Sequence, residues 1–236
     1  MRIRAISLDL DDTLWPIEPV IVRAEQLLDA WLKTHCPHTA AAFPIAQMRA
    51  LRERISAEHP HLSHDFTAQR LLSLRAALTP HGYDESHVER AFDAYYTARN
   101  EVELYPDALA ALERLAARYP LVSISNGNAD LERIGLKRFF RHTISSRATG
   151  VAKPAAPIFH AACAQLGLRP DEVLHVGDDP ELDVAGARAA GLRSAWLKRH
   201  DAYAATPVAD ITVRDLTELA DWLDRRNGDT ASSALA

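Results

Sequence analysis

The stretch Ile6-Ser7-Leu8-Asp9-Leu10-Asp11-Asp12-Thr13-Leu14 decides the fold, because a largely apolar run ends there in three acidic residues within four positions. A buried parallel strand has such an apolar run, and its carboxyl end is where open α/β sheets bind ligands. Carboxylates gathered at that end repel one another unless a cation or shared protons relieve them, and oxygen ligands suit a hard ion such as Mg²⁺. The alternative is an acidic loop or a helix cap at Asp12 or Thr13.

The second half of the chain alternates short apolar segments with helical ones. Segments suited to strands cover residues 121–125, 142–146, 173–176, 194–197 and 211–213. Apolar residues recur at helical spacing over residues 107–118, 158–166, 183–190 and 215–225. This alternation predicts right-handed β-α-β crossovers and a parallel sheet, a Rossmann-like α/β fold.

Residues 21–99 show helical spacing throughout and no alternating strand pattern. After a first helix that begins near Ile21, further helices are expected at residues 45–58, 67–78 and 85–99. We therefore expect an α/β core formed by residues 1–16 and 101–226. An inserted four-helix domain, residues 17–100, is expected above the carboxyl edge of the sheet. The tail, residues 227–236, is expected to be disordered.

Composition and charge argue against several classes of function. The net charge is −5, whereas nucleic-acid-binding proteins usually carry an excess of basic residues. No segment has the length and uniform hydrophobicity of a membrane span, and the first apolar run leads into Asp9 instead of a signal-peptide cleavage site. Two distant cysteines, Cys36 and Cys163, fit a reducing compartment. We expect a cytoplasmic protein, monomer or homodimer, with no nucleic-acid or membrane partner.

Two further strand ends carry polar residues. Ser125-Asn126-Gly127 follows an apolar segment, and its hydroxyl and backbone N–H groups suit an anion such as phosphate. An ordinary Asn-Gly turn is the alternative. Lys153-Pro154 leads into a helix, where the lysine is either a cation for that anion or a solvated surface charge.

A fourth strand end carries a second acidic cluster, Gly177-Asp178-Asp179, with Asp183 four residues further on. Capping of the following helix by Asp179 or Asp183 is enough to explain such a cluster on its own.

Considered together, the four strand ends predict one site. In a parallel sheet, Asp9, Asp11 and Asp178 reach the same edge and can share one cation. Lys153 and the Ser125 hydroxyl can then bind phosphate oxygens and offset the charge of the carboxylates.

In this order and spacing, the four motifs resemble those of the haloacid dehalogenase-like (HAD) hydrolase superfamily. The resemblance covers nearly the whole chain and implies a Rossmann-like HAD core with an inserted all-helical cap of the C1 type. Dehalogenases of the superfamily usually lack an acid at the position of Asp11, so its presence implies the phosphatase branch. The leaving oxygen of a phosphate ester needs a proton donor, whereas a halide does not. Asp12 stands where many members have glycine, which narrows the subfamily.

The resemblance implies a mechanism with named parts. Asp9 would attack phosphorus and form an aspartyl-phosphate, and Asp11 would protonate the leaving oxygen and then act as base on water. Asp9, Asp178 and the backbone carbonyl of Asp11 would bind Mg²⁺. Asp183 would lie in the second shell and orient the lysine or a metal-bound water, and Asp179 could take either part.

Shorter fragments resemble a narrower group, the bacterial phosphatases that act on flavin mononucleotide (FMN) and on 5-amino-6-(5-phospho-D-ribitylamino)uracil. The fragments are Asp9 to Leu14 followed by Pro19-Val20-Ile21, then His64-Asp65-Phe66-Thr67, Ser125-Asn126-Gly127-Asn128-Ala129 and Leu174-His175-Val176-Gly177-Asp178-Asp179, with Trp196 later. The implied partner is a small phosphorylated metabolite of riboflavin biosynthesis.

Two residues are candidates for contact with the substrate. Trp15 adjoins the catalytic strand end, where it either stacks on a flat substrate ring or packs as a hinge residue. Arg70 either meets a phosphate or a polar tail or is a plain exposed arginine. The histidines near residue 60 favour a solvated loop over a transition-metal site.

Other functions remain open at this level. They are a nucleotidase or sugar phosphatase of the same superfamily, a 2-haloacid dehalogenase, and a non-catalytic phosphate-binding protein.

Overall fold

The computed structural model describes residues 3–200 and 207–233, with side chains described up to residue 226. The chain divides into two compact units. The α/β unit comprises residues 1–16, 103–126 and 135–236, and the helical unit comprises residues 17–102 and 127–134. The expected insertion, residues 17–100, is therefore joined by a second segment, 127–134, which the sequence pattern did not indicate.

The α/β unit is built on one sheet of six parallel strands in the order β3-β2-β1-β4-β5-β6. The strands are β1 (Ala5–Leu8), β2 (Leu121–Ser125), β3 (Phe140–Ser145), β4 (Val173–Gly177), β5 (Arg193–Leu197) and β6 (Ile211–Val213). Every residue of β1, β2 and β4 is buried, as expected for central strands that are covered on both faces. The Rossmann-like parallel sheet expected from the alternating pattern is confirmed.

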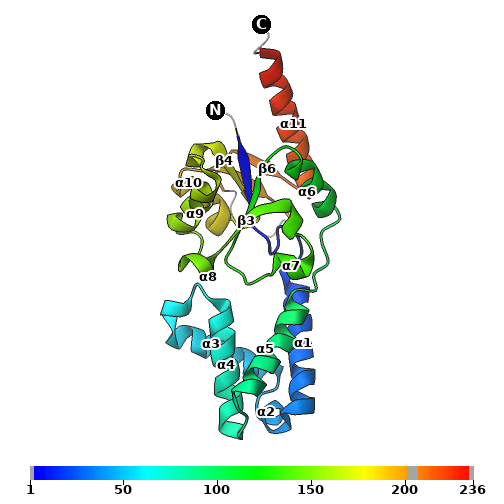
Figure 1. Cartoon of the computed structure of the whole chain (residues 1–236), viewed down its shortest axis with the longest axis vertical. Helices are drawn as coiled ribbons and strands as arrows, with labels where there is room; N and C mark the ends of the chain where they lie inside the picture. Colours follow the sequence, from blue (N-terminus) through cyan, green and yellow to red (C-terminus); the bar gives the residue numbers. More distant parts are fainter. Residues whose placement is uncertain (1–2, 201–206, 234–236) are drawn as a thin grey trace. The chain divides into compact units, whose positions relative to one another are not determined.

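Helices cover both faces of this sheet, with α9 and α10 on one side and α6 and α11 on the other (Figure 1). The helices of the unit are α6 (Ala108–Ala116), α8 (Ser146–Thr149), α9 (Ala156–Leu166), α10 (Gly186–Ala189) and α11 (Leu216–Ser233). Two 3₁₀ turns, η3 (Lys137–Phe139) and η4 (Pro170–Glu172), and one π-helical segment, η5 (Pro180–Ala185), complete it. Buried apolar side chains of α9 and α10 form a core with those of β1 to β4.

Two expectations for this unit were wrong in detail. The single helix expected at residues 183–190 is a π-helical segment followed by the short helix α10. The last helix does not stop at residue 225, because α11 continues to Ser233 through part of the expected disordered tail. Residues 234–236 lie outside the described residues.

The helical unit has the four long helices expected and, in addition, two short ones. Its helices are α1 (Ile17–His35), α2 (Pro37–Ala42), α3 (Ile45–Glu58), α4 (Phe66–Leu78), α5 (Glu85–Arg99) and α7 (Leu131–Ile134), with 3₁₀ turns η1 (Pro60–Leu62) and η2 (Thr79–His81). Asp65 and Asp84 are the N-caps of α4 and α5, so each accepts a backbone N–H left unpaired at a helix start. Buried apolar residues of α1 to α5 form a core of their own.

The segment 127–134 is bound within the helical unit by polar contacts. The Asn128 amide donates to the Thr67 hydroxyl at 3.3 Å, and the Asp130 backbone N–H donates to Asn100 Oδ1 at 2.7 Å. The chain therefore passes from one unit to the other directly after Asn126, inside the second of the four motifs.

Candidate active site

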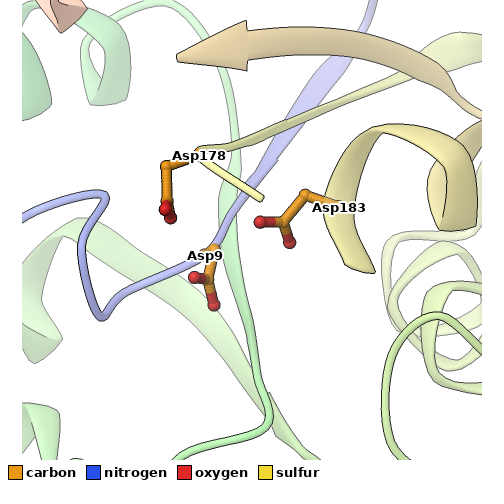
Figure 2. Close-up of side chains that lie close together, drawn as sticks. All are labelled: Asp9, Asp178 and Asp183. Carbon is orange, nitrogen blue, oxygen red and sulfur yellow. The ribbon is translucent and has the colours of Figure 1, made fainter. Parts of the chain in front are cut away.

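Three carboxylates meet at the carboxyl end of the sheet. Asp9 follows β1 and Asp178 follows β4, and these strands are neighbours with Leu8 paired to Val176, so the two acids leave the sheet side by side. Asp183 comes from η5 and reaches the same place (Figure 2). One oxygen of each acid lies within 4.8 Å of the others, which makes this the single group of metal-ligating side chains among the described residues.

Lys153 lies between two of these acids. Its Nζ is 2.6 Å from Asp9 Oδ1 and 2.6 Å from Asp183 Oδ1, and the side chain is buried. The lysine is thus an inward cation and not a solvated surface charge. Asn126 holds its main chain from both sides, since its Oδ1 accepts the Lys153 N–H at 2.7 Å and its Nδ2 donates to the Lys153 carbonyl at 3.0 Å.

Asp183 is held by donors on both of its oxygens. Its Oδ1 also accepts from His175 Nε2 at 3.0 Å, and its Oδ2 accepts the Asp179 backbone N–H at 3.1 Å. The other ring nitrogen of His175 lies 2.9 Å from the Ser7 hydroxyl, and these two residues are paired in register on β4 and β1. Gly177 makes the arrangement possible, because a Cβ at that position would lie 2.2 Å from the Asp183 carboxyl carbon.

Burial and neighbouring charge shift the pKa values of this group in opposite directions. Burial raises the pKa of Asp9 well above its ordinary value, and the charges of Asp183 and Asp178 add to that effect against the lowering influence of Lys153. Burial by itself would also raise the pKa of Asp183, but Lys153 and His175 hold it below the ordinary range. Burial alone would lower the pKa of Lys153, yet its two acidic partners raise it, so the ammonium stays charged.

The loop after β1 is fixed by contacts with residues that follow β4 and β5. Asp12 has a left-handed backbone with φ of 57°, a conformation that aspartate tolerates better than most residues and that glycine adopts without strain. This explains how an aspartate can stand where many HAD proteins have glycine. The Thr13 hydroxyl donates to Asp178 Oδ1 at 3.1 Å, and Arg199 donates to the Thr13 carbonyl at 2.8 Å while pairing with Asp107.

Asp11 is oriented by Trp15 within the same loop. The indole Nε1 of Trp15 donates to Asp11 Oδ1 at 2.8 Å. The Trp15 side chain has 0% of its surface exposed, so it presents no face to a substrate ring. Stacking on a substrate is therefore wrong for Trp15, and packing within the core is the interpretation that fits.

The structure also shows the surroundings of three other predicted site residues, Asp179, Ser125 and Asn126. The carboxylate of Asp179 caps η5 by accepting the N–H groups of Glu181 and Leu182, each at 2.8 Å, and only its backbone touches Asp183. Capping of the following helical segment, one of the alternatives for Asp179, is therefore confirmed. Ser125 is buried at the end of β2, and the side chain of Asn126 is occupied by Lys153.

Two predicted residues lie in the helical unit. Arg70 is not a plain exposed arginine, because it is buried there with its guanidinium 3.9 Å from the centre of the Tyr95 ring. Gly127 is the first residue of the segment 127–134, next to Asn126 in the chain.

Sequence reasoning missed the residues that support the acids. Ser7 and His175 lie inside apolar strands, and a polar residue at a position buried on both faces is the signal that could have found them. Trp196 donates its indole N–H to the Asp178 carbonyl at 2.8 Å, and only the packing of β5 against β4 brings it there.

The chain matches the haloacid dehalogenase-like hydrolase family over residues 3–191. It belongs to that family. Three of the four motifs of this HAD hydrolase follow the neighbouring strands β2, β1 and β4. The strand end expected at Lys153-Pro154 is wrong, because this motif lies between α8 and α9.

Curated relatives of this HAD hydrolase include phosphatases. It is 30% identical over 201 residues to the 5-amino-6-(5-phospho-D-ribitylamino)uracil phosphatase YigB of Escherichia coli (strain K12), covering 84% of each chain. It is 29% identical over 237 residues to a phosphoglycolate phosphatase of Chromobacterium violaceum, covering 96% of this chain and 98% of the relative.

A solved structure of a 2-haloacid dehalogenase from Pseudomonas syringae pv. Tomato DC3000 is also similar to this HAD hydrolase. The TM-score is 0.87 at 33% identity, with 94% of this chain and 99% of the other covered. Fold likeness alone therefore does not separate the two reactions, and the residues of the site have to do so.

The acidic cluster fits a divalent metal ion. Asp9, Asp178 and Asp183 carry three negative charges when ionised, and Lys153 compensates only one of them. The remaining charge of two matches a divalent cation, and carboxylate oxygens are the ligands of hard ions.

Whether a helix can cross a membrane depends on its length and its hydropathy. Among the described residues, no helix has the length and apolarity needed to cross a membrane.

Proposed function

We propose that this HAD hydrolase is a Mg²⁺-dependent phosphatase that cleaves small-molecule phosphate monoesters through an aspartyl-phosphate. One observation supports this most directly: the buried Lys153 bridges Asp9 and Asp183 directly beside Asp178. Such a site combines a nucleophile, a cation for phosphate oxygens and ligands for a metal ion.

Each protein group has a defined task in this proposal. An oxygen of Asp9 forms a bond to phosphorus while the bond between phosphorus and the ester oxygen breaks. Asp11 gives its proton to the departing ester oxygen. Asp11 then takes a proton from water, whose oxygen bonds to phosphorus as the bond to Asp9 breaks. Lys153 holds Asp9 in place and offsets phosphate charge, together with the Ser125 hydroxyl and the backbone N–H groups after it.

Asp9, Asp178 and the backbone carbonyl of Asp11 are the proposed metal ligands. When bound, Mg²⁺ would neutralise these carboxylates and withdraw charge from a phosphate oxygen. We place Asp183 outside this set, since both of its oxygens already accept hydrogen bonds from protein donors.

FMN or 5-amino-6-(5-phospho-D-ribitylamino)uracil is the proposed substrate, on the strength of the similarity to the Escherichia coli phosphatase. A nucleoside monophosphate or a sugar phosphate is the alternative within the same reaction. We propose that the helical unit makes this choice, because inserted segments vary while the catalytic strand ends stay in place. Arg70 stays a low-priority candidate for substrate contact.

A second candidate reaction is 2-haloacid dehalogenation, which the likeness to the Pseudomonas syringae structure favours. Asp11 speaks against it, because halide departure needs no proton. Release of chloride from 2-chloropropionate without added metal would support this alternative.

The test is phosphate release from FMN, the ribitylaminouracil phosphate, sugar phosphates and nucleoside monophosphates, with Mg²⁺ or with EDTA. We expect release only with Mg²⁺, and Asp9→Asn as the matched control should release none. Preference for another ester would discard the flavin assignment and keep the reaction. Silence from the metal-loaded enzyme across the panel, with phosphate still bound, would favour a non-catalytic phosphate-binding protein.

A further inference from the structure

The contact between Trp15 and Asp11 has a chemical consequence beyond packing. An indole N–H can donate a hydrogen bond but cannot accept one. Asp11 Oδ1, 2.8 Å from Trp15 Nε1, is therefore an acceptor in this contact whether or not the carboxyl group carries a proton. The carbonyl oxygen of a carboxylic acid is a stronger acceptor than its hydroxyl oxygen, so this contact favours a proton of Asp11 on Oδ2.

We propose that Trp15 is a positioning residue that keeps the transferable proton of Asp11 on Oδ2 and fixes the direction in which that oxygen points. This inference rests on the proposed phosphatase function, in which Asp11 protonates the leaving oxygen. It assigns to Trp15 a part in the reaction that does not require contact with the substrate.

The indole is held firmly enough to do this. The Trp15 ring is fully buried, and the Trp15 carbonyl accepts the Asp12 backbone N–H at 2.8 Å, which ties the two ends of the turn together. The preceding carbonyl, that of Leu14, accepts the Tyr105 N–H at 2.9 Å. A donor fixed by both its ring and its backbone constrains the carboxyl group more tightly than a solvent-exposed side chain would.

The proposal predicts an effect that depends on the leaving group. When the ester bond breaks, an alkoxide needs the proton from Asp11, whereas 4-nitrophenolate is stable enough to leave without one. A change that misdirects the proton therefore slows an alkyl phosphate more than 4-nitrophenyl phosphate. Damage to the fold, to metal binding or to the nucleophile slows both esters by the same factor.

The experiment compares kcat/KM for glycerol 2-phosphate and for 4-nitrophenyl phosphate in the Mg²⁺-loaded full chain. Trp15→Phe removes the N–H and keeps an aromatic ring in the core. We expect a loss of about tenfold or more on the alkyl ester and less than about threefold on the nitrophenyl ester, since general acids contribute about a hundredfold or more. Asp11→Asn should show the same selectivity with a larger loss on the alkyl ester.

Trp196→Phe is the matched control. It also deletes a buried indole N–H close to the acids, but that N–H donates to the Asp178 backbone carbonyl and not to the proposed acid. We expect it to lower both activities by one common factor. Equal losses on both esters in Trp15→Phe would overturn the proposal.

Two further outcomes are informative. If Trp15→Phe does not fold, Trp15→Tyr also removes the indole N–H, and a larger loss on the alkyl ester than on the nitrophenyl ester supports the proposal. A tyrosine variant that folds but lowers both activities by one common factor overturns it. A wild-type chain that is inactive on these two esters and on every phosphate ester of the panel above refutes the phosphatase function itself, and the role of Trp15 with it.

Discussion

Two lysine–aspartate pairs in this protein have nearly the same length and opposite surroundings. Lys153 and Asp183 in the α/β unit are 2.6 Å apart, with 2% and 1% of their side chains exposed. Lys33 and Asp29 on α1 of the helical unit are 2.7 Å apart, with 67% and 15% exposed. The separation is almost equal, so burial and the neighbouring charges determine what each pair does.

The buried pair is part of the candidate active site, whereas the exposed pair adds little to the stability of the fold. An exposed ion pair contributes between about 0 and 1 kcal/mol to stability, because water already solvates both charges. A buried charge that loses its partner costs several kcal/mol, and Lys153 has two acidic partners with a third acid close by. Carboxylates that repel one another in this way are typical of functional sites.

The largest effect is expected on turnover, after substitution of the proposed nucleophile Asp9. Asp9→Asn keeps the shape of the side chain but provides no nucleophile, so we expect turnover to fall by about a thousandfold or more. We expect no loss in the free energy of unfolding, because the change removes one of three crowded acids. Burial and the two neighbouring acids raise the pKa of Asp9, so its charge is unfavourable in the folded chain. Steady-state phosphate release and thermal unfolding check the two parts. Near-normal turnover in this variant would refute the covalent mechanism.

Removal of the two lysines tests the comparison directly. Lys153→Met leaves buried carboxylates without their cation, and we expect a loss of about 3–5 kcal/mol in the free energy of unfolding. Lys33→Met is the matched control at an exposed pair, with an expected change below about 0.5 kcal/mol. Urea unfolding at neutral pH measures both. Similar losses in the two variants would show that burial does not distinguish the pairs.

A smaller effect is expected from crowding Asp183. Gly177→Ala places a methyl group against the Asp183 carboxyl, where a Cβ would come within 2.2 Å, and we expect a loss of about 2–3 kcal/mol. Gly135→Ala is the control, because its φ of 83° is strained for alanine but no atom lies within 4 Å of the added carbon. That control should lose about 1 kcal/mol and keep its turnover. A larger loss in the control would place the cost in the backbone.

The smallest effect concerns Glu25, a buried acid on α1 of the helical unit. Its carboxylate pairs with Arg49 at 2.5 Å and Arg52 at 3.0 Å. Burial alone would raise its pKa, but these arginines hold the pKa below its ordinary value. A lowered pKa means that ionised Glu25 contributes stability above the pKa of the unfolded chain, about 4.3, and that this contribution disappears as the pH falls through the folded value.

Glu25→Gln should therefore cost about 1–2 kcal/mol at neutral pH. The gap between the variant and the wild-type chain should close below about pH 4. Urea unfolding of both proteins between neutral pH and the acid range measures that gap. A gap that grows on acidification would mean that the acid destabilises the helical unit.

Local signals in the sequence determined most of the fold. The apolar runs at 121–125 and 173–176 appear as β2 and β4, and helical spacing located α3 and α5 at the expected residues. These elements could be predicted because burial on both faces, or on one stripe, leaves a pattern within a few residues. Two features could not be predicted in this way, because they depend on contacts between residues far apart in the sequence. They are the π-helical segment η5 and the inclusion of residues 127–134 in the helical unit.

The sequence by itself determined the family, the parallel sheet and the candidate catalytic residues, because three of the four motifs directly follow short strand-forming segments. Only the tertiary structure decided how those residues support one another. It placed Lys153 between Asp9 and Asp183, buried Trp15 behind Asp11, and turned the Asp179 carboxylate toward a helix start. Such contacts join side chains from separate elements, so their directions depend on packing that no local pattern records.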